Sequence, residues 1–258
     1  MPYYKPVISP IARFIRRRWR PFAYRGTGFT CPLCGGTFRR RAEGEGKNCP
    51  GCGCPDRARL FWLYLEREWP RFFEDPAVLI EFAPIPILEK RLRMLPNLKY
   101  LSSDPYEPEA MIRLDLRDLD LPDESFDYVI CMHVLAHIAN DRKAMREMLR
   151  ILRPGGVAFI MTPVDDDRAV TFEDPCIIDP REKSKIYGHS DYVRTYGRDF
   201  TDRLRESGFD VAVVRPARDL DEATLKTCDL WDDVIYVSRR PLPVASDRST
   251  VPSGPGSG

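Results

Sequence analysis

Short apolar runs separated by a helical pattern mark the centre of this chain. Residues 126–132 and 157–161 are apolar runs bounded by turn residues, which predicts two buried parallel strands. Between them apolar residues recur at helical spacing, with Asn140 or Asp141 placed to cap the helix. One face of this helix would carry Ala144, Met148 and Ile151. Strand, helix and strand in so few residues predict a right-handed parallel crossover with a ligand crevice at the carboxyl ends of its strands.

Further runs extend this pattern into a full α/β domain. Apolar stretches at 78–83, 100–104 and 112–115 predict three more strands, and 209–214 and 234–237 predict a closing antiparallel pair. Helical patterns cover residues 56–75 and 200–207. We therefore expect a mainly parallel, seven-stranded, Rossmann-like sheet with helices on both faces.

The central crossover also carries a resemblance. The segments FDYVICMHVLAHI and LRILRPGG resemble the fourth strand, following helix and fifth strand of class I S-adenosylmethionine-dependent methyltransferases. Ala136 stands where the commonest branch of that family has Glu. The resemblance implies a Rossmann-like methyltransferase domain that binds S-adenosylmethionine.

Five of the eight cysteines lie close together near the N-terminus. Cys31 and Cys34 form one C-x-x-C pair and Cys49 and Cys52 form another, with 14 residues between the pairs. Two such pairs let four thiolates converge on Zn²⁺, so we expect a structural zinc ribbon held by these four residues. Cys54 could replace Cys52 as a ligand. Four thiolates leave no open coordination position, so the metal would stabilise the fold and take no part in catalysis.

Composition divides the chain into a basic head and an acidic body. Residues 1–60 hold 13 Lys and Arg against 3 Asp and Glu, whereas the rest of the chain holds 27 against 36. The head therefore suits an anion, which could be RNA, an acidic partner or its own acidic body. We expect a basic segment at 1–28, the zinc ribbon at 29–56, the catalytic domain at 57–240 and a disordered tail at 241–258, which is rich in Pro, Ser and Gly.

No apolar run approaches the length of a membrane span, and the N-terminus lacks the apolar core of a signal peptide. Cysteines with metal-site spacing, in place of a disulfide framework, also suit a reducing compartment. These features predict a cytoplasmic protein.

The donor site follows from the resemblance. The turn after the first strand, Ala83-Pro84-Ile85-Pro86, lacks the usual glycines, but it resembles a branch with an N-terminal cysteine-rich ribbon in which this strand ends in F-A-P. Asp104, at the end of the second strand, could accept the ribose hydroxyls, and Asp115 with Leu116 resembles the pair that meets the adenine. The residues expected to contact the donor are Glu81, Phe82, Ala83, Pro84, Asp104, Asp115, Leu116, Met132 and His133. An altered or inactive pocket remains the alternative.

The acceptor site is expected near the end of the fourth strand. The segment YGHSDYVRTYG at 187–197 resembles a G-Q-x-D-H-V-R-x-Y-G motif of the same branch and suits either an acceptor lid or a loop held by an Asp–Arg pair. An oxygen or nitrogen acceptor needs a base within hydrogen-bond reach. We expect His189 or Asp191 in that role, ahead of His133, for which a structural role is equally open.

These features together predict a methyltransferase that acts on an oxygen or nitrogen atom of a small molecule or sugar. One alternative is an RNA methyltransferase whose basic ribbon grips phosphates through Arg39, Arg40, Arg41 and Phe38. The other is a non-catalytic zinc-ribbon binding protein on a decayed methyltransferase fold.

Overall fold

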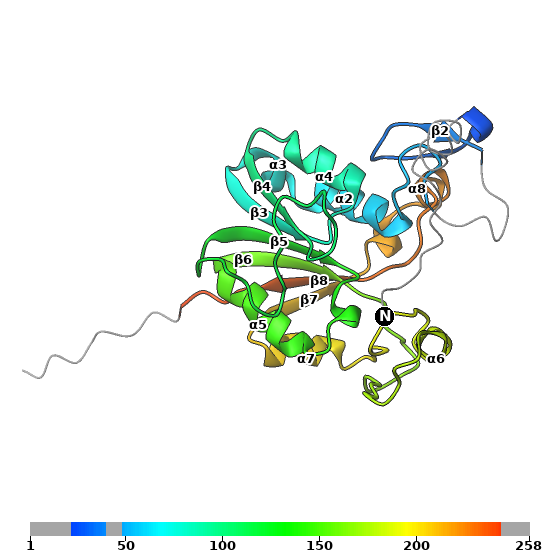
Figure 1. The fold of residues 1–258 in the computed structure, drawn as a ribbon. Coiled ribbons are helices and arrows are strands. Elements are labelled where there is room, and N and C mark those ends of the chain that lie inside the picture. The colour runs from blue at the N-terminus through cyan, green and yellow to red at the C-terminus, as the bar shows by residue number, and fades with distance from the viewer. Residues whose placement is uncertain (1–21, 40–47, 244–258) are drawn as a thin grey trace, which may run out of the picture.

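A computed structural model describes residues 22–39 and 48–243, and a mixed six-stranded sheet forms their centre (Figure 1). Its strand order is β4-β3-β5-β6-β8-β7. The strands are β3 (Ala77–Phe82), β4 (Leu98–Ser103), β5 (Phe126–Met132), β6 (Leu152–Met161), β7 (Asp210–Val214) and β8 (Ile235–Arg239). β8 runs antiparallel to β6 and β7, whereas the pairs among β3 to β6 are parallel. The predicted Rossmann-like, mainly parallel architecture is confirmed.

One expected strand is missing from this sheet. Residues 112–115 form only isolated bridges, from Ile112 to Ser103 and from Asp115 to Asp118. The backbone N–H of Arg117 donates to Asp115 Oδ1 at 2.9 Å, and such a local turn competes with pairing along a strand. The expectation of a seventh strand was therefore wrong for this segment.

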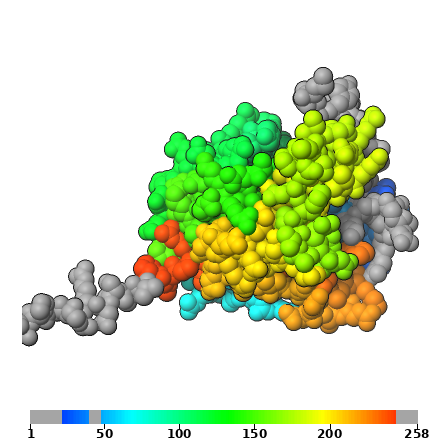
Figure 2. Space-filling model, turned by 90° about the horizontal axis from the view of Figure 1, so that it is seen from below, coloured from blue at the N-terminus to red at the C-terminus, as the bar shows by residue number. Residues whose placement is uncertain are grey.

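Helices cover both faces of the sheet. On one face lie α2 (Asp56–Glu68), α3 (Pro70–Glu74) and α4 (Pro86–Arg93). On the other lie the 3₁₀ turn η1 (Leu135–His137), α5 (Asp141–Ile151) and α7 (Phe200–Glu206). Figure 2 shows the surface of this second face, with α7 in yellow beside the lime-green segment of α6 (Pro180–Ile186). The remaining short helices are η2 (Pro216–Asp219) and α8 (Glu222–Cys228).

The central crossover folds as its pattern predicts. Asn140 caps α5, since its Oδ1 accepts a 3.0 Å hydrogen bond from the N–H of Lys143. The predicted apolar face is buried at Ala144, Met148 and Ile151. β6 begins directly after the helix, so β5, α5 and β6 form one parallel unit at the centre of the sheet.

The cysteine-rich module is fastened to the body by arginines. Its strands β1 (Arg25–Thr30) and β2 (Thr37–Phe38) form a small antiparallel pair. The fully buried Arg59 guanidinium donates to the carbonyl oxygens of Cys54, Cys228 and Asp229, and Arg91 Nε donates to that of Leu33 at 2.8 Å. α2 follows Cys54 almost directly, so the module packs on the domain without an intervening linker.

Some expectations lie outside the described residues. These concern most of the basic segment 1–28, the residues Arg40 and Arg41, and most of the tail 241–258. Within 22–39 and 48–243, no helix is long and apolar enough to cross a membrane.

Candidate active site

The candidate ligand site lies where the strand order of the sheet reverses, at β3. β4 lies on one side of β3 and β5 lies on the other, and ligands of open α/β sheets bind outside the carboxyl ends of strands at such a switch point. Ala83 directly follows β3 and His133 directly follows β5, with backbone φ angles of +53° and +56°. Left-handed conformations are uncommon for residues other than glycine and often mark functional sites. Two such residues on neighbouring strands single out this edge.

Buried polar atoms without partners collect along the same edge. Ser103 Oγ, His133 Nε2 and Thr162 Oγ1 lack hydrogen-bond partners among the described residues. Ser103 ends β4, and the other two residues directly follow β5 and β6. Since buried polar groups are nearly always hydrogen-bonded, this row of atoms is typical of a site that a polar ligand completes.

Glu81 holds the turn after β3. Tyr100 Oη donates to its Oε2 at 2.6 Å and the backbone N–H of Ile85 donates to its Oε1 at 3.1 Å. Burial raises the pKa of Glu81 to about 7. Both carboxylate oxygens thus support the glycine-free turn, and its expected contact with the donor stays a prediction.

Only one carboxylate oxygen of Asp104, Oδ1, accepts hydrogen bonds from the described residues, and Oδ2 accepts none. Its Oδ1 accepts hydrogen bonds from the N–H groups of Tyr106 and Glu107, at 2.7 and 2.9 Å. Asp115 instead forms an exposed ion pair with Arg117, at 2.6 Å, and Leu116 beside it is buried. The other expected donor contacts, Phe82, Ala83, Pro84, Met132 and His133, lie at the ends of β3 and β5. The structure thus gathers most of this set at one edge, but the carboxylates of Asp115 and Glu81 are occupied by contacts within the chain.

His133 lies deep in the crevice. Its Nε2 is 4.0 Å from Asp233 Oδ2. Burial, reinforced by the charge of Arg57, lowers the pKa of His133 to about 3. The imidazole is therefore neutral at physiological pH, but a nitrogen of such low basicity is a weak general base.

The other two histidines meet at the surface. His137, His189 and Asp191 are exposed, and their ligating atoms lie within 4.8 Å of one another. The His189 and Tyr192 rings are 5.0 Å apart, and both pack near His137. Two imidazoles and a carboxylate could hold a proton or a divalent metal here. Of the three expected catalytic residues, the structure thus places His189 and Asp191 together.

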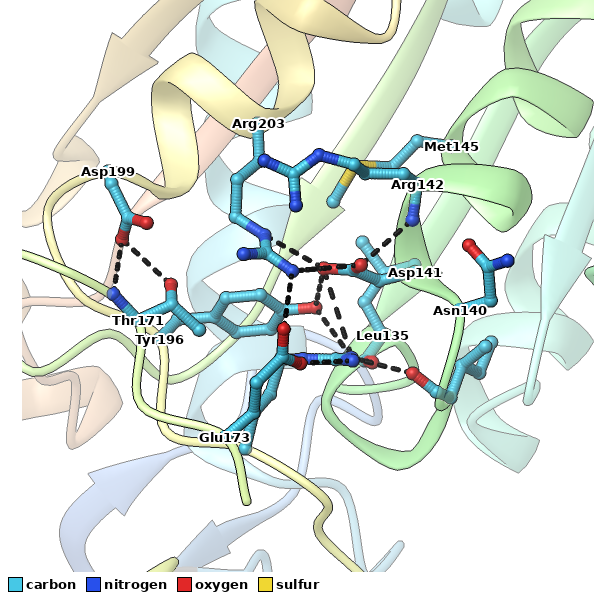
Figure 3. A network of polar contacts seen from close by, with 12 residues as sticks. Leu135, Asn140, Asp141, Arg142, Met145, Thr171, Glu173, Tyr196, Asp199 and Arg203 are labelled. Carbon is cyan, nitrogen blue, oxygen red and sulfur yellow. Dashed lines mark hydrogen bonds and ion pairs between the residues drawn. The ribbon is translucent and has the colours of Figure 1, made fainter. Parts of the chain in front are cut away.

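The VRTYG segment at 193–197 turns inward. Arg194 and Tyr196 are almost fully buried, and Arg194 lies 3.8 Å from the Asp141 carboxylate. Tyr196 Oη donates a 2.9 Å hydrogen bond to Asp141 at the start of α5 (Figure 3). Arg203 donates two 3.0 Å hydrogen bonds to the same carboxylate. Arg194 also pairs with Glu173, at 2.7 Å, and donates to the carbonyl oxygens of Leu135, Ile138 and Ala139. Arg194 and Tyr196 therefore anchor the segment 187–197 to the residues that follow β5, and its expected role as an acceptor lid stays a prediction.

Five sulfur atoms converge in the cysteine cluster. The Sγ atoms of Cys31, Cys49, Cys52 and Cys54 lie within 4.8 Å of one another, and Cys34 Sγ is 3.8 Å from that of Cys49. Cys31 Sγ is 3.8 Å from Cys52 Sγ and 3.6 Å from Cys54 Sγ. Zn–S bonds of about 2.3 Å place tetrahedral sulfurs about 3.8 Å apart. The donor set and its spacing are consistent with zinc, and Cys34 and Cys54 compete for the fourth position.

The central part of the chain matches a known family. Residues 91–160 fit the family model described as a methyltransferase domain. This stretch is therefore similar to the methyltransferase domains of class I S-adenosylmethionine-dependent enzymes. The stretch that matches includes β4, β5 and α5, whereas β3 and the turn that follows it lie before the stretch.

Individual relatives match shorter parts of the methyltransferase domain. Phosphatidylethanolamine N-methyltransferase of Cereibacter sphaeroides is 35% identical over 63 residues, which are 24% of this chain and 31% of that protein. A probable S-adenosylmethionine-dependent methyltransferase of Mycolicibacterium smegmatis is 41% identical over 49 residues, 19% of each chain. The chain thus spans less than a third of these curated relatives.

The fold is shared more widely than the reaction. The crystal structure of the [4+2]-cyclase SpnF has a TM-score of 0.53 to this chain at 15% identity, covering 78% of this chain and 86% of that one. A methyltransferase domain can therefore share its fold with a protein of another named activity, and the reaction must be argued from the site.

Proposed function

We propose that this chain transfers a methyl group from S-adenosylmethionine to an oxygen or nitrogen atom of a small molecule or sugar. The observation that carries the proposal is the row of unpartnered polar atoms at the ends of β4, β5 and β6. Two of these residues, Ser103 and His133, lie inside the stretch that matches a methyltransferase domain. A donor bound there would complete hydrogen bonds that the chain leaves open. Asp104 would hold the ribose through its free Oδ2, and residues 82–84 and 132–133 would line the remainder of the donor.

The chain's own contribution to such a reaction is mainly positioning. The sulfonium of the donor supplies an activated methyl group, so transfer needs in-line geometry and the exclusion of water. The anchored lid keeps residues 189–192 over the turn after β5, since the N–H of Val193 donates to the carbonyl of Ala136 at 2.9 Å. His189 or Asp191 would accept the proton that the acceptor loses, because neutral His133 is too weakly basic.

Calorimetric titration of S-adenosylhomocysteine into the zinc-loaded protein tests the donor site. Micromolar binding is expected for the wild type. Asp104→Asn keeps an acceptor for the two backbone N–H groups but removes the charge, and should weaken binding by about tenfold or more, as expected for charge-assisted hydrogen bonds worth ~1.5–3 kcal/mol. Asp120→Ala, a nearby exposed acid, is the matched control and should bind normally.

The same titration separates the alternatives. Absence of binding to the folded protein would contradict an enzyme and favour a non-catalytic binding protein. RNA binding that weakens steeply with salt would favour an RNA acceptor. Against that alternative, Arg25 and Arg39 lie over the module's own rings of Phe22 and Tyr24, at 4.5 and 4.6 Å.

We also propose Zn²⁺ as the structural ion of the cysteine cluster. Thiolates are soft ligands that select zinc over magnesium or calcium. The small β1–β2 module gains its folding free energy from such a site. Zinc content would be measured in the Cys34→Ser and Cys54→Ser variants. The variant that loses the spare cysteine should keep one zinc per chain, and the variant that loses a ligand should lose its zinc.

A further inference from the structure

Arg57 is a half-buried cation whose Nε has no hydrogen-bond partner among the described residues. It is the second residue of α2, three positions after Cys54. Its Nε is buried and makes no hydrogen bond, and within the described residues its guanidinium forms no ion pair. Guanidinium carries five N–H donors, so leaving it unsatisfied in a half-buried position costs free energy unless a ligand binds there.

The groups around Arg57 come from four separate elements. Its charge acts on His133 at the end of β5 and on Tyr192 of the lid. Asp233, in the turn before β8, interacts with Arg57 in turn and lies 4.0 Å from His133. His133 Nε2 also lacks a hydrogen bond within the described chain. Two side chains from different elements that interact electrostatically thus each keep a buried nitrogen without a hydrogen-bond partner among the described residues.

Arg57 and His133 lie on the acceptor side of the crevice. The residues proposed for the adenosyl part of the donor, Asp104 and Asp115, follow β4 at one end of the strand order. His133, Thr162 and Asp233 border β5, β6 and β8, on the other side of the switch point. A molecule bound against Arg57 would thus meet the donor near the end of β5.

We propose that Arg57 and His133 bind a carboxylate group of the methyl acceptor. Arginine pairs with carboxylates through two parallel hydrogen bonds, which fix orientation as well as affinity. One guanidinium suits a single negative charge, and the nearby Asp233 would repel the second charge of a phosphate dianion. This inference rests on the proposed methyl transfer and narrows its substrates to small carboxylic acids.

Matched probes test the assignment without a known acceptor. Benzoate and its neutral analogue benzamide would be titrated calorimetrically into zinc-loaded protein saturated with S-adenosylhomocysteine. The wild type should prefer benzoate by about tenfold or more, because the amide leaves the guanidinium uncompensated. Arg57→Gln should abolish this preference, whereas Arg71→Gln, at an exposed arginine, should retain it. Equal binding of the two probes, or a preference that survives in Arg57→Gln, would overturn the proposal.

A second arm asks whether Arg57 instead serves the donor. S-adenosylhomocysteine carries a carboxylate, and 5′-methylthioadenosine does not. Arg57→Gln should leave both affinities within about twofold of wild type. A loss confined to S-adenosylhomocysteine would assign Arg57 to the donor and refute the acceptor site. If neither nucleoside binds the wild type, the proposed function fails, and the benzoate preference, measured on donor-free protein, still decides the role of Arg57.

Discussion

The buried carboxyl of Glu81 should make the stability of this domain depend on pH. Its pKa rises from an ordinary 4.5 to about 7 because the side chain is fully buried. At 1.36 kcal/mol per pH unit, that rise corresponds to about 3 kcal/mol. A folded state that holds its proton more tightly than the unfolded state is favoured at low pH. The contribution is therefore complete below pH 4.5 and is lost as the pH rises through 7.

Glu81→Gln removes the titration but keeps an oxygen that accepts from Ile85. The free energy of unfolding would be measured with urea from pH 5 to pH 9, with tryptophan fluorescence as the signal. As the pH rises, the free energy of unfolding of the variant should increase relative to that of the wild type, by up to about 3 kcal/mol. Glu74→Gln, at an exposed site, should follow the wild type. A difference between Glu81→Gln and wild type that stays constant across this range would refute the reasoning.

Three further outcomes follow from the packing. Chelation of the metal should unfold the β1–β2 module and lower the melting temperature, as scanning calorimetry would show, and added zinc should restore it; a chelator-insensitive transition would contradict a structural ion. Ala83→Gly should raise the free energy of unfolding in urea by up to about 1 kcal/mol, because glycine tolerates the positive φ of that residue. A lower free energy of unfolding would show that contacts of the Ala83 methyl group outweigh the backbone strain. Arg194→Met leaves Asp141 with one fewer partner and should lower the free energy of unfolding by about 3 kcal/mol or more. The affinity of the folded fraction for S-adenosylhomocysteine should not change. A variant as stable as wild type would show that Arg203 alone suffices to pair with Asp141.

The hydrophobic pattern predicts the central elements because their burial is local in sequence. Alternation of apolar runs with a helical period places β5, α5 and β6 within a residue or a few of their observed bounds. The edge beside β4 was mispredicted, since residues 112–115 look like a strand but their side chains bond to their own turn. Pattern alone does not show that local competition.

The site depends more on tertiary placement. Arg194 and Tyr196 look like acceptor residues in sequence, but their partner, Asp141, lies more than 50 residues away at the start of α5. Arg57 sits in an ordinary helical pattern, and only the fold brings it to His133. Its position three residues after Cys54 is the one signal that the sequence offers.

The short path from Cys54 to Arg57 links the two halves of the molecule. Cys54, the last cysteine of the cluster, and Arg57 are three residues apart, and the guanidinium of Arg59 in the same helix donates to the carbonyl of Cys54. Any rearrangement of the sulfur atoms would shift the first turn of α2 and the guanidinium with it. The cysteine-rich module therefore determines where Arg57 lies in the proposed acceptor site. If the cluster holds zinc, loss of the metal should lower the proposed preference for carboxylates before the methyltransferase domain unfolds.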